Sequence, residues 1–179
     1  MPRPSLRTTA IVTLLLLAAG GWIAARSLDA SSSPGCLVAD GTQTYHLDRQ
    51  QVANALIITA AARDNGLEHH AVTVALAAAI RESQLRNLKH GDRDSLGLFQ
   101  QRPSQGWGTP AEILDPHTAA SRFFLALRRV DRWQAMPVTQ AAQTVQHSAT
   151  PTAYAAVEPE GRAIARATTG ERPGTLRCA

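Results

Sequence analysis

The chain has 179 residues, enough for one compact domain plus a terminal segment and too few for two full cores. Its net charge is +4 at neutral pH, and Arg3, Arg7, Arg26 and Asp29 together contribute +2 of that. The rest of the chain therefore lacks the clustered positive charge of a nucleic-acid-binding face, and we expect no nucleic-acid partner.

Residues 1–30 predict a signal peptide or a signal-anchor transmembrane segment. Arg3 and Arg7 precede an uncharged stretch of 18 residues, 8–25. This is slightly longer than the apolar region of a signal peptide, roughly 7–15 residues, and slightly short for a membrane span. Cleavage and retention both remain open, and either outcome makes the protein extracytoplasmic. We expect it to be secreted to the cell envelope or anchored to the cell membrane through this segment.

The only two cysteines, Cys36 and Cys178, lie near the two ends of the exported part. In an exported protein such a pair predicts one disulfide that joins the termini of the domain. Residues 31–47 are expected to form a linker and a turn-containing lead-in. The folded domain is then expected over residues 48–179.

The first two helices have clear boundary signals. Asp48 and Gln51 form a variant of the capping box, and Gly66 is the expected stop of the helix that follows. The expected apolar positions of this helix are Val52, Leu56, Ile57 and Ala60. A second helix is expected over residues 69–83. Its apolar residues occupy almost every side, which predicts a buried helix.

Residues 84–115 have little periodicity and predict a long structured loop, a length that in compact domains usually indicates function. Three more helices are expected. One starts at Pro116 with Asp115 as its cap and extends through Val130, and the next covers residues 137–147. The last covers about 150–168, with a break at Pro159 and Gly161. The prediction is a mainly α single domain with at most a minor strand element.

Glu82 stands at the end of the buried helix and admits two interpretations. It could form an ordinary surface pair with Arg86, four residues later. Against this, Ala75, Ala78 and Ala79 precede it on the same helix face and leave space beside it. A half-buried carboxyl group in such a space is typical of a general acid.

The residues after Glu82 carry a resemblance. Glu82-Ser83 is followed, fifteen positions after the glutamate, by Gly97-Leu98-Phe99-Gln100-Gln101, and Pro103 comes three residues after Gln100. This arrangement resembles the lytic transglycosylase (SLT-type) branch of the lysozyme-like superfamily, which has Glu-Ser at a helix end and then Gly-Leu-Met-Gln with a proline three residues later. The Ala-Tyr pair of that family, which faces the glutamate, has a counterpart in Ala153-Tyr154. The resemblance covers about residues 50–165.

The resemblance implies a lysozyme-like fold and an enzyme that cleaves peptidoglycan glycan strands between N-acetylmuramic acid and N-acetylglucosamine. Glu82 would be the single general acid and base, and no cofactor or metal is expected. The implied substrate-binding residues are Ser83, Gly97, Leu98, Phe99, Gln100, Gln101 and Tyr154. Trp107, between glycines in the same loop, is a further candidate as a sugar-stacking platform. We expect a monomer whose partner is the glycan strand.

Two alternatives remain open. Asp94 could act as a second carboxylate that activates water, which would make the protein a hydrolytic muramidase. Asp92 and Asp94 have a simpler interpretation as turn caps paired with Arg93 or Lys89. The second alternative is a catalytically inactive wall-binding or scaffold module, because the family's Tyr-Asn-x-Gly is here Tyr154-Ala155-Ala156-Val157.

Overall fold

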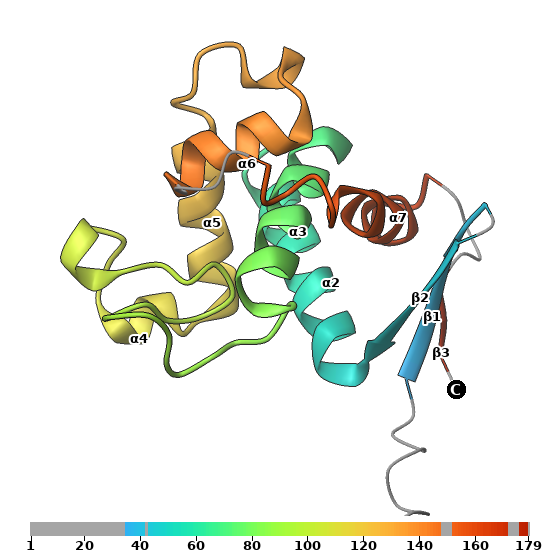
Figure 1. Ribbon diagram of the computed structural model, residues 1–179, viewed down its shortest axis with the longest axis horizontal. Helices are drawn as coiled ribbons and strands as arrows, with labels where there is room; N and C mark the ends of the chain where they lie inside the picture. The colour runs from blue at the N-terminus through green and yellow to red at the C-terminus, as the bar shows by residue number, and fades with distance from the viewer. Residues whose placement is uncertain (1–34, 42, 148–151, 172–175, 179) are drawn as a thin grey trace, which may run out of the picture. The chain divides into compact units, whose positions relative to one another are not determined.

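The computed structural model (Figure 1) describes residues 35–41, 43–147, 152–171 and 176–178, and the expected signal or anchor segment lies outside them. The described residues form a mostly helical domain with a small three-stranded antiparallel sheet, so the mainly α prediction is confirmed at this level. None of the described helices combines the length and the apolar character needed to span a membrane.

The sheet is formed by the two ends of the domain. Strands β1 (Gly35–Asp40) and β2 (Gln43–Asp48) pair as an antiparallel hairpin, and β3 (Leu176–Cys178) pairs with the other edge of β1. Cys36 lies opposite Cys178 in this pairing, and the two form the predicted disulfide.

The hairpin corrects the expected lead-in. Residues 31–47 were expected to form a linker and a turn-containing lead-in, with the folded domain over residues 48–179, but the folded unit begins at Gly35 and includes β1 and β2. Each strand has six residues, and in β1 only Cys36 and Val38 are buried whereas Leu37 is 41% exposed. Such a short alternation of buried and exposed residues is a weak sequence signal for a strand. The strand β1 is completed by its pairing with β3.

Helix α2 (Arg49–Asp64) has the predicted boundaries. Asp48 and Gln51 form the complete capping box, and Gly66 follows the helix in the left-handed conformation at φ 64°. The expected apolar face is displaced, however, because Leu56 is 46% exposed. The buried side chains of α2 are Asn54, Ala55, Ile58, Thr59, Ala61 and Ala62.

Helix α3 (His69–Ser83) lies at the centre of the domain, with the predicted bounds. Every residue from Ala71 to Ile80 is buried, and the helix packs against α2, α5 (Pro116–Leu127), α6 (Val138–Gln146) and α7 (Glu158–Thr169) (Figure 1). The prediction of a buried rather than an amphipathic helix is confirmed. Its C-terminal end carries Glu82 to the loop that follows.

The long loop after α3 contains short helical turns that the sequence did not predict. These are a 3₁₀ turn at Pro103–Gln105 and helix α4 (Pro110–Ile113), which is capped by Thr109. Asp115 caps α5 as expected, and α5 ends at Leu127, three residues before the expected Val130. A second 3₁₀ turn at Trp133–Ala135 joins α5 to α6.

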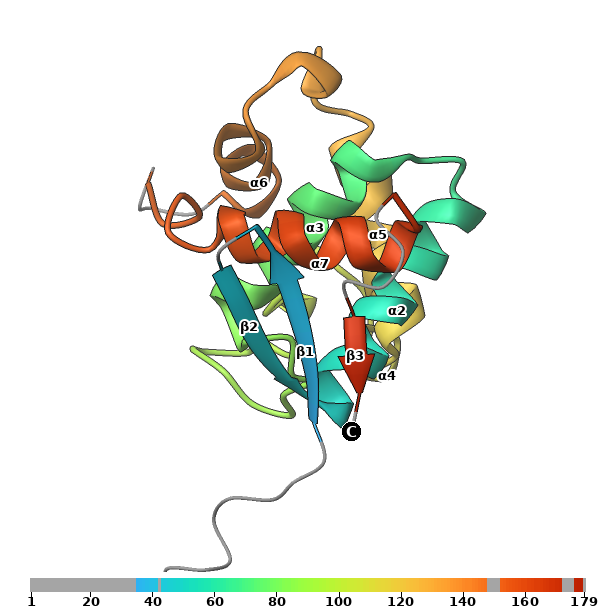
Figure 2. The same ribbon diagram turned by 90° about the vertical axis from the view of Figure 1, so that its right-hand side faces the viewer.

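Helix α7 lies between α3 and the sheet (Figure 2) and corrects the expected break at Pro159 and Gly161. Pro159 stands in the first turn, where its missing N–H costs no hydrogen bond, so it begins the helix instead of interrupting it. Gly161 faces α3, and a Cβ at this position would lie 3.0 Å from the backbone nitrogen of Ala77. The glycine therefore permits a close approach of the two helices.

Candidate functional site

Glu82 lies in the last turn of α3 and is half-buried. The hydroxyl of Tyr154, a fully buried side chain, donates a hydrogen bond of 2.8 Å to its Oε1. The two residues are 72 positions apart in sequence, and Tyr154 lies in the turns just before α7. No described residue is hydrogen-bonded to Oε2 of Glu82. One oxygen of this carboxyl group is thus fixed by the protein, and the other is left for a different partner.

The surface pair between Glu82 and Arg86 is not formed. Arg86 instead binds the carboxylate of Asp48 at 2.6 Å and the side chain of Gln50 at 3.2 Å. The pKa of Asp48 lies below its usual value because the backbone N–H of Gln51 and the Arg86 guanidinium both donate to its carboxylate. Arg86 therefore ties the end of α3 to the start of α2.

The chain turns sharply after α3 through two residues in the left-handed conformation. Gln84 has φ 54° and Leu85 has φ 58°, although neither is a glycine, and Leu85 is also buried. Two side chains of α2 bind their carbonyl groups: Gln51 Nε2 donates to Gln84 at 3.0 Å, and Asn54 Nδ2 donates to Leu85 at 2.7 Å. Left-handed backbone is costly for residues with a Cβ, and persists where surrounding contacts impose it. The sequence analysis did not predict this left-handed turn. The polar Asn54 on a buried helix face is the one feature of the sequence that could have indicated it.

Ser83 connects α3 to the Gly97–Gln101 segment. Its buried hydroxyl donates to the carbonyl of Leu98 at 2.7 Å. Leu98 and Phe99 themselves are buried in the core, and the Phe99 ring stacks on Phe123 with centroids 4.8 Å apart. Ser83, Leu98 and Phe99 were expected to bind substrate; in the structure their side chains are buried, and Ser83 and Phe99 hold the segment against the core.

Gly97 and Gln101 likewise stabilise the loop. Gly97 has φ 76°, and a Cβ there would lie 2.6 Å from the carbonyl oxygen of Ile113, so the glycine is required by packing. Gln101 is 2% exposed and donates to the carbonyl of Ala119 at 3.2 Å, which leaves it out of reach of a substrate. Gln100 is half-buried, and its Nε2 donates to the carbonyl of Gly97 at 3.2 Å. Of the two glutamines, only Gln100 remains a candidate for contact with a ligand.

Asp94, the candidate second carboxylate, is engaged on both oxygens. Arg102 Nε donates to Oδ1 at 2.6 Å, and the backbone N–H of Ser104 donates to Oδ2 at 2.8 Å. The Ser104 N–H first, and then the Arg102 guanidinium, hold the pKa of this carboxyl well below its usual range. The expected partners, Arg93 and Lys89, were wrong for Asp94. A carboxylate so strongly stabilised as an anion is a weak base.

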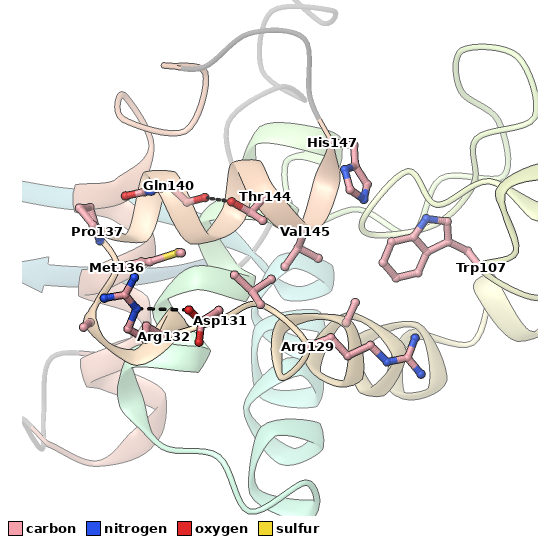
Figure 3. A pocket seen from close by; sticks show the side chains of 13 residues that line it. Trp107, Arg129, Asp131, Arg132, Met136, Pro137, Gln140, Thr144, Val145 and His147 are labelled. Carbon is pink, nitrogen blue, oxygen red and sulfur yellow. Dashed lines mark hydrogen bonds and ion pairs between the residues drawn. The ribbon is translucent and has the colours of Figure 1, made fainter.

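Trp107 is not part of the contacts around Glu82 described above. It lies in a groove between the C-terminal half of α5 and α6 (Figure 3). The groove consists of two adjoining cavities of about 800 and about 780 Å³ that share Trp107, Ala126, Arg129 and His147, and we call it the Trp107 groove. Glu82 lines neither cavity. Trp133, by contrast, is only 8% exposed and stacks on His70, which makes it a core residue.

No protein-family model and no curated protein matches this chain. Within the described ranges, no three His, Cys, Asp or Glu side chains are grouped so as to hold a metal ion. The chemistry offered by the described site is that of a single carboxyl group at a helix end, oriented by a buried phenol.

Proposed function

We propose that this chain is a lysozyme-like enzyme that cleaves peptidoglycan glycan strands between N-acetylmuramic acid and N-acetylglucosamine, as a lytic transglycosylase. The observation that supports it best is the hydrogen bond of 2.8 Å from Tyr154 to Glu82. It brings the Glu-Ser and Ala-Tyr elements of the resemblance together from opposite parts of the chain. The third element, the Gly97–Gln101 segment, is attached to the same helix end through Ser83.

In this proposal Glu82 first acts as a general acid. It donates its proton to the glycosidic oxygen as the bond from C1 to that oxygen breaks, and the acetamido group of the substrate stabilises the cation that develops at C1. Glu82, now a carboxylate, then removes the proton from the 6-hydroxyl of the same sugar, whose oxygen bonds to C1. The products are a shortened glycan strand and a strand that ends in a 1,6-anhydro sugar, and no water is consumed.

Tyr154 would position the acid. Its hydroxyl holds Oε1, and Oε2 of Glu82, to which none of the described residues is hydrogen-bonded, is the oxygen that would exchange a proton with the substrate. A hydrogen bond from a buried phenol restricts the carboxyl group to few rotamers, which is a positioning effect.

The hydrolytic alternative is less well supported. A muramidase needs a second carboxylate that accepts a proton from water, and both oxygens of Asp94 already accept hydrogen bonds from Arg102 and Ser104. The inactive wall-binding module is favoured only by the departure from Tyr-Asn-x-Gly at Tyr154-Ala155-Ala156-Val157, and the experiment below separates it from the enzyme.

The proposed place of action is outside the cytoplasm, at the cell envelope. The disulfide between Cys36 and Cys178 supports this, because disulfides persist in oxidising compartments. Attachment to the membrane through residues 1–30 is part of the same proposal.

The test is zymography of the full-length protein on purified peptidoglycan, beside the Glu82→Gln variant. We expect the parent to clear the gel and the variant to leave it intact, because the amide cannot donate or accept the proton. Glu68→Gln is a suitable control, since Glu68 precedes α3 at its opposite end. Clearing by neither parent nor variant would favour a binding module. Clearing by Glu82→Gln would remove Glu82 from its role.

A further inference from the structure

The Trp107 groove contains positive charge that the described residues do not neutralise. Among its cations, Arg122 is paired with Glu112 at 2.6 Å and Arg132 with Asp131 at 3.3 Å. The guanidinium of Arg129 has no hydrogen-bond or ion-pair partner within the part of the chain that the structure describes. An exposed guanidinium on the wall of a groove is a ready donor to a carboxylate.

The remaining lining is mostly apolar and small. Its apolar part consists of Ala126, Val130, Ala135, Met136, Pro137 and Val145, with the Trp107 ring at one end, and its polar part of Gln140, Thr144 and His147. Figure 3 shows the Trp107 and His147 rings beside the same open space, with the Arg129 side chain reaching along its floor toward Trp107. Cavities of a few hundred to about 1,000 Å³ accommodate ligands larger than a monosaccharide. The groove thus suits an extended ligand that combines small apolar groups with a carboxylate.

The groove adjoins the Glu82 site through a continuous series of contacts. Ser83 binds the carbonyl of Leu98 at 2.7 Å, and the next carbonyl, that of Phe99, accepts from Gln146 Nε2 at 2.9 Å. Gln146 is the last residue of α6, and its neighbour His147 lines both cavities of the groove. The backbone segment that Ser83 holds at the end of α3 is therefore the same segment that Gln146 holds beside the groove.

We propose that the Trp107 groove binds the stem peptide of peptidoglycan, with Arg129 donating hydrogen bonds to one of its carboxylates. The stem peptide consists of short residues, alanine among them, that alternate methyl groups with free carboxylates, which matches the lining. This inference rests on the proposed function, because it assigns the groove to the same substrate. The other source of a carboxylate in that substrate is the lactyl group of muramic acid, which is free only after the stem peptide has been removed.

The first experiment measures binding alone, by isothermal titration of the free L-alanyl-γ-D-glutamyl stem peptide into full-length Glu82→Gln protein. Adding Arg129→Gln should weaken binding about fivefold, as expected for the loss of a charge-assisted hydrogen bond at an exposed site. Arg128→Gln is the matched control, because Arg128 is also exposed but lines a different cavity. Equal affinities for the Arg129 and Arg128 variants, or no binding by the parent, would overturn the proposal.

The second experiment identifies the source of the carboxylate. Cleavage by protein with intact Glu82 is measured on stem-bearing strands and on strands stripped of their peptides by an amidase. We expect Arg129→Gln to raise KM about fivefold on stem-bearing strands and to leave it unchanged on stripped strands. An equal increase on both would assign the groove to the lactyl carboxylate or the sugars and overturn the stem-peptide assignment. If no strand is cleaved at all, the proposed function fails, while the titration still decides the binding of the peptide.

Discussion

Tyr154 is the residue on which the orientation of Glu82 depends. It is fully buried, and its hydroxyl lies 2.8 Å from Oε1 of the glutamate. An intramolecular hydrogen bond contributes about 0.5–1.5 kcal/mol net, and its removal leaves the carboxyl group free to rotate away from a bound sugar.

Tyr154→Phe should therefore lower kcat on peptidoglycan by up to about tenfold, with little change in stability, since the ring and its packing remain. Tyr45→Phe is the matched control: Tyr45 is the only other tyrosine of the chain, and its hydroxyl binds Gln43 in the hairpin. The rate of muropeptide release checks this. Equal rates for the Tyr154 and Tyr45 variants would show that the contact has no role in positioning.

Asp94 should stabilise the loop without taking part in the reaction. Its folded-state pKa is depressed below the usual value near 3.9, so its contribution to stability is fully present above about pH 4 and is lost as the pH falls below that value. Asp94→Asn should lower Tm at pH 7, and the difference from the parent should shrink as the pH falls below about 4. Thermal unfolding followed by circular dichroism from pH 2 to 7 measures both.

Asp92→Asn provides the control, because Asp92 is largely exposed and lies 3.9 Å from its nearest cation, Arg93. The product of any reaction should be the same for the Asp94 and Asp92 variants. A folded Asp94→Asn protein that no longer cleaves would reinstate Asp94 as a catalytic base.

Among the contacts between helices, the packing of α7 on α3 most directly holds Tyr154 in place. α7 begins four residues after Tyr154, and Gly161 lets it approach the backbone of Ala77. The atoms of Ala77 at this contact are its backbone nitrogen, Cα and Cβ, which cannot move aside by a change of rotamer.

Gly161→Ala should for this reason destabilise the domain by about 1–3 kcal/mol, even though alanine is intrinsically better in a helix by about 1 kcal/mol. Urea unfolding measures the change. Ala167→Gly is a useful comparison, because it tests the intrinsic preference alone at a half-buried position of the same helix. An unchanged or higher midpoint for Gly161→Ala would mean that α3 and α7 do not pack this closely.

The sequence predicts those elements whose signals are local. Asp48 and Gln51 form a cap within four residues, and the apolar run of α3 predicts its burial and its bounds. The hairpin was missed because each strand is short and is completed by β3, more than a hundred residues away. The break expected in α7 was wrong. Proline and glycine often interrupt helices, but here Pro159 stands in the first turn and Gly161 lies at the contact with α3, and the sequence alone does not distinguish these cases.

The residues of the candidate site also divide into those that a sequence pattern predicts and those that only the tertiary fold determines. The resemblance indicated that Tyr154 would face Glu82, but no local pattern shows that Gln101 is buried against Ala119. The contact between Asn54 and the Leu85 carbonyl also depends on the tertiary fold. Residue type and spacing therefore predict which segments meet, and the packing determines which of their side chains remain accessible.

At the scale of the whole molecule, one disulfide closes the domain. Cys36 and Cys178 are 142 positions apart, and their bond fastens β3 to β1. In the chain-entropy treatment a loop of this length contributes roughly 4–5 kcal/mol.

The Cys36→Ser/Cys178→Ser double variant should therefore lower Tm by about 10 °C or more, and reductant should lower the Tm of the parent by a similar amount. Reductant should leave the Tm of the double variant unchanged, which serves as the control. Alkylation of the parent without reductant, followed by intact-mass measurement, should add no label. Two labelled thiols would contradict the disulfide.

The mass of the released muropeptides reveals whether Glu82 cleaves the glycan strand without a second carboxylate. We predict that the full-length protein releases muropeptides that end in 1,6-anhydro sugars, each lighter by one water than the hydrolytic product, and that Glu82→Gln releases none. Products with reducing ends, or release that persists in Glu82→Gln, would contradict the account.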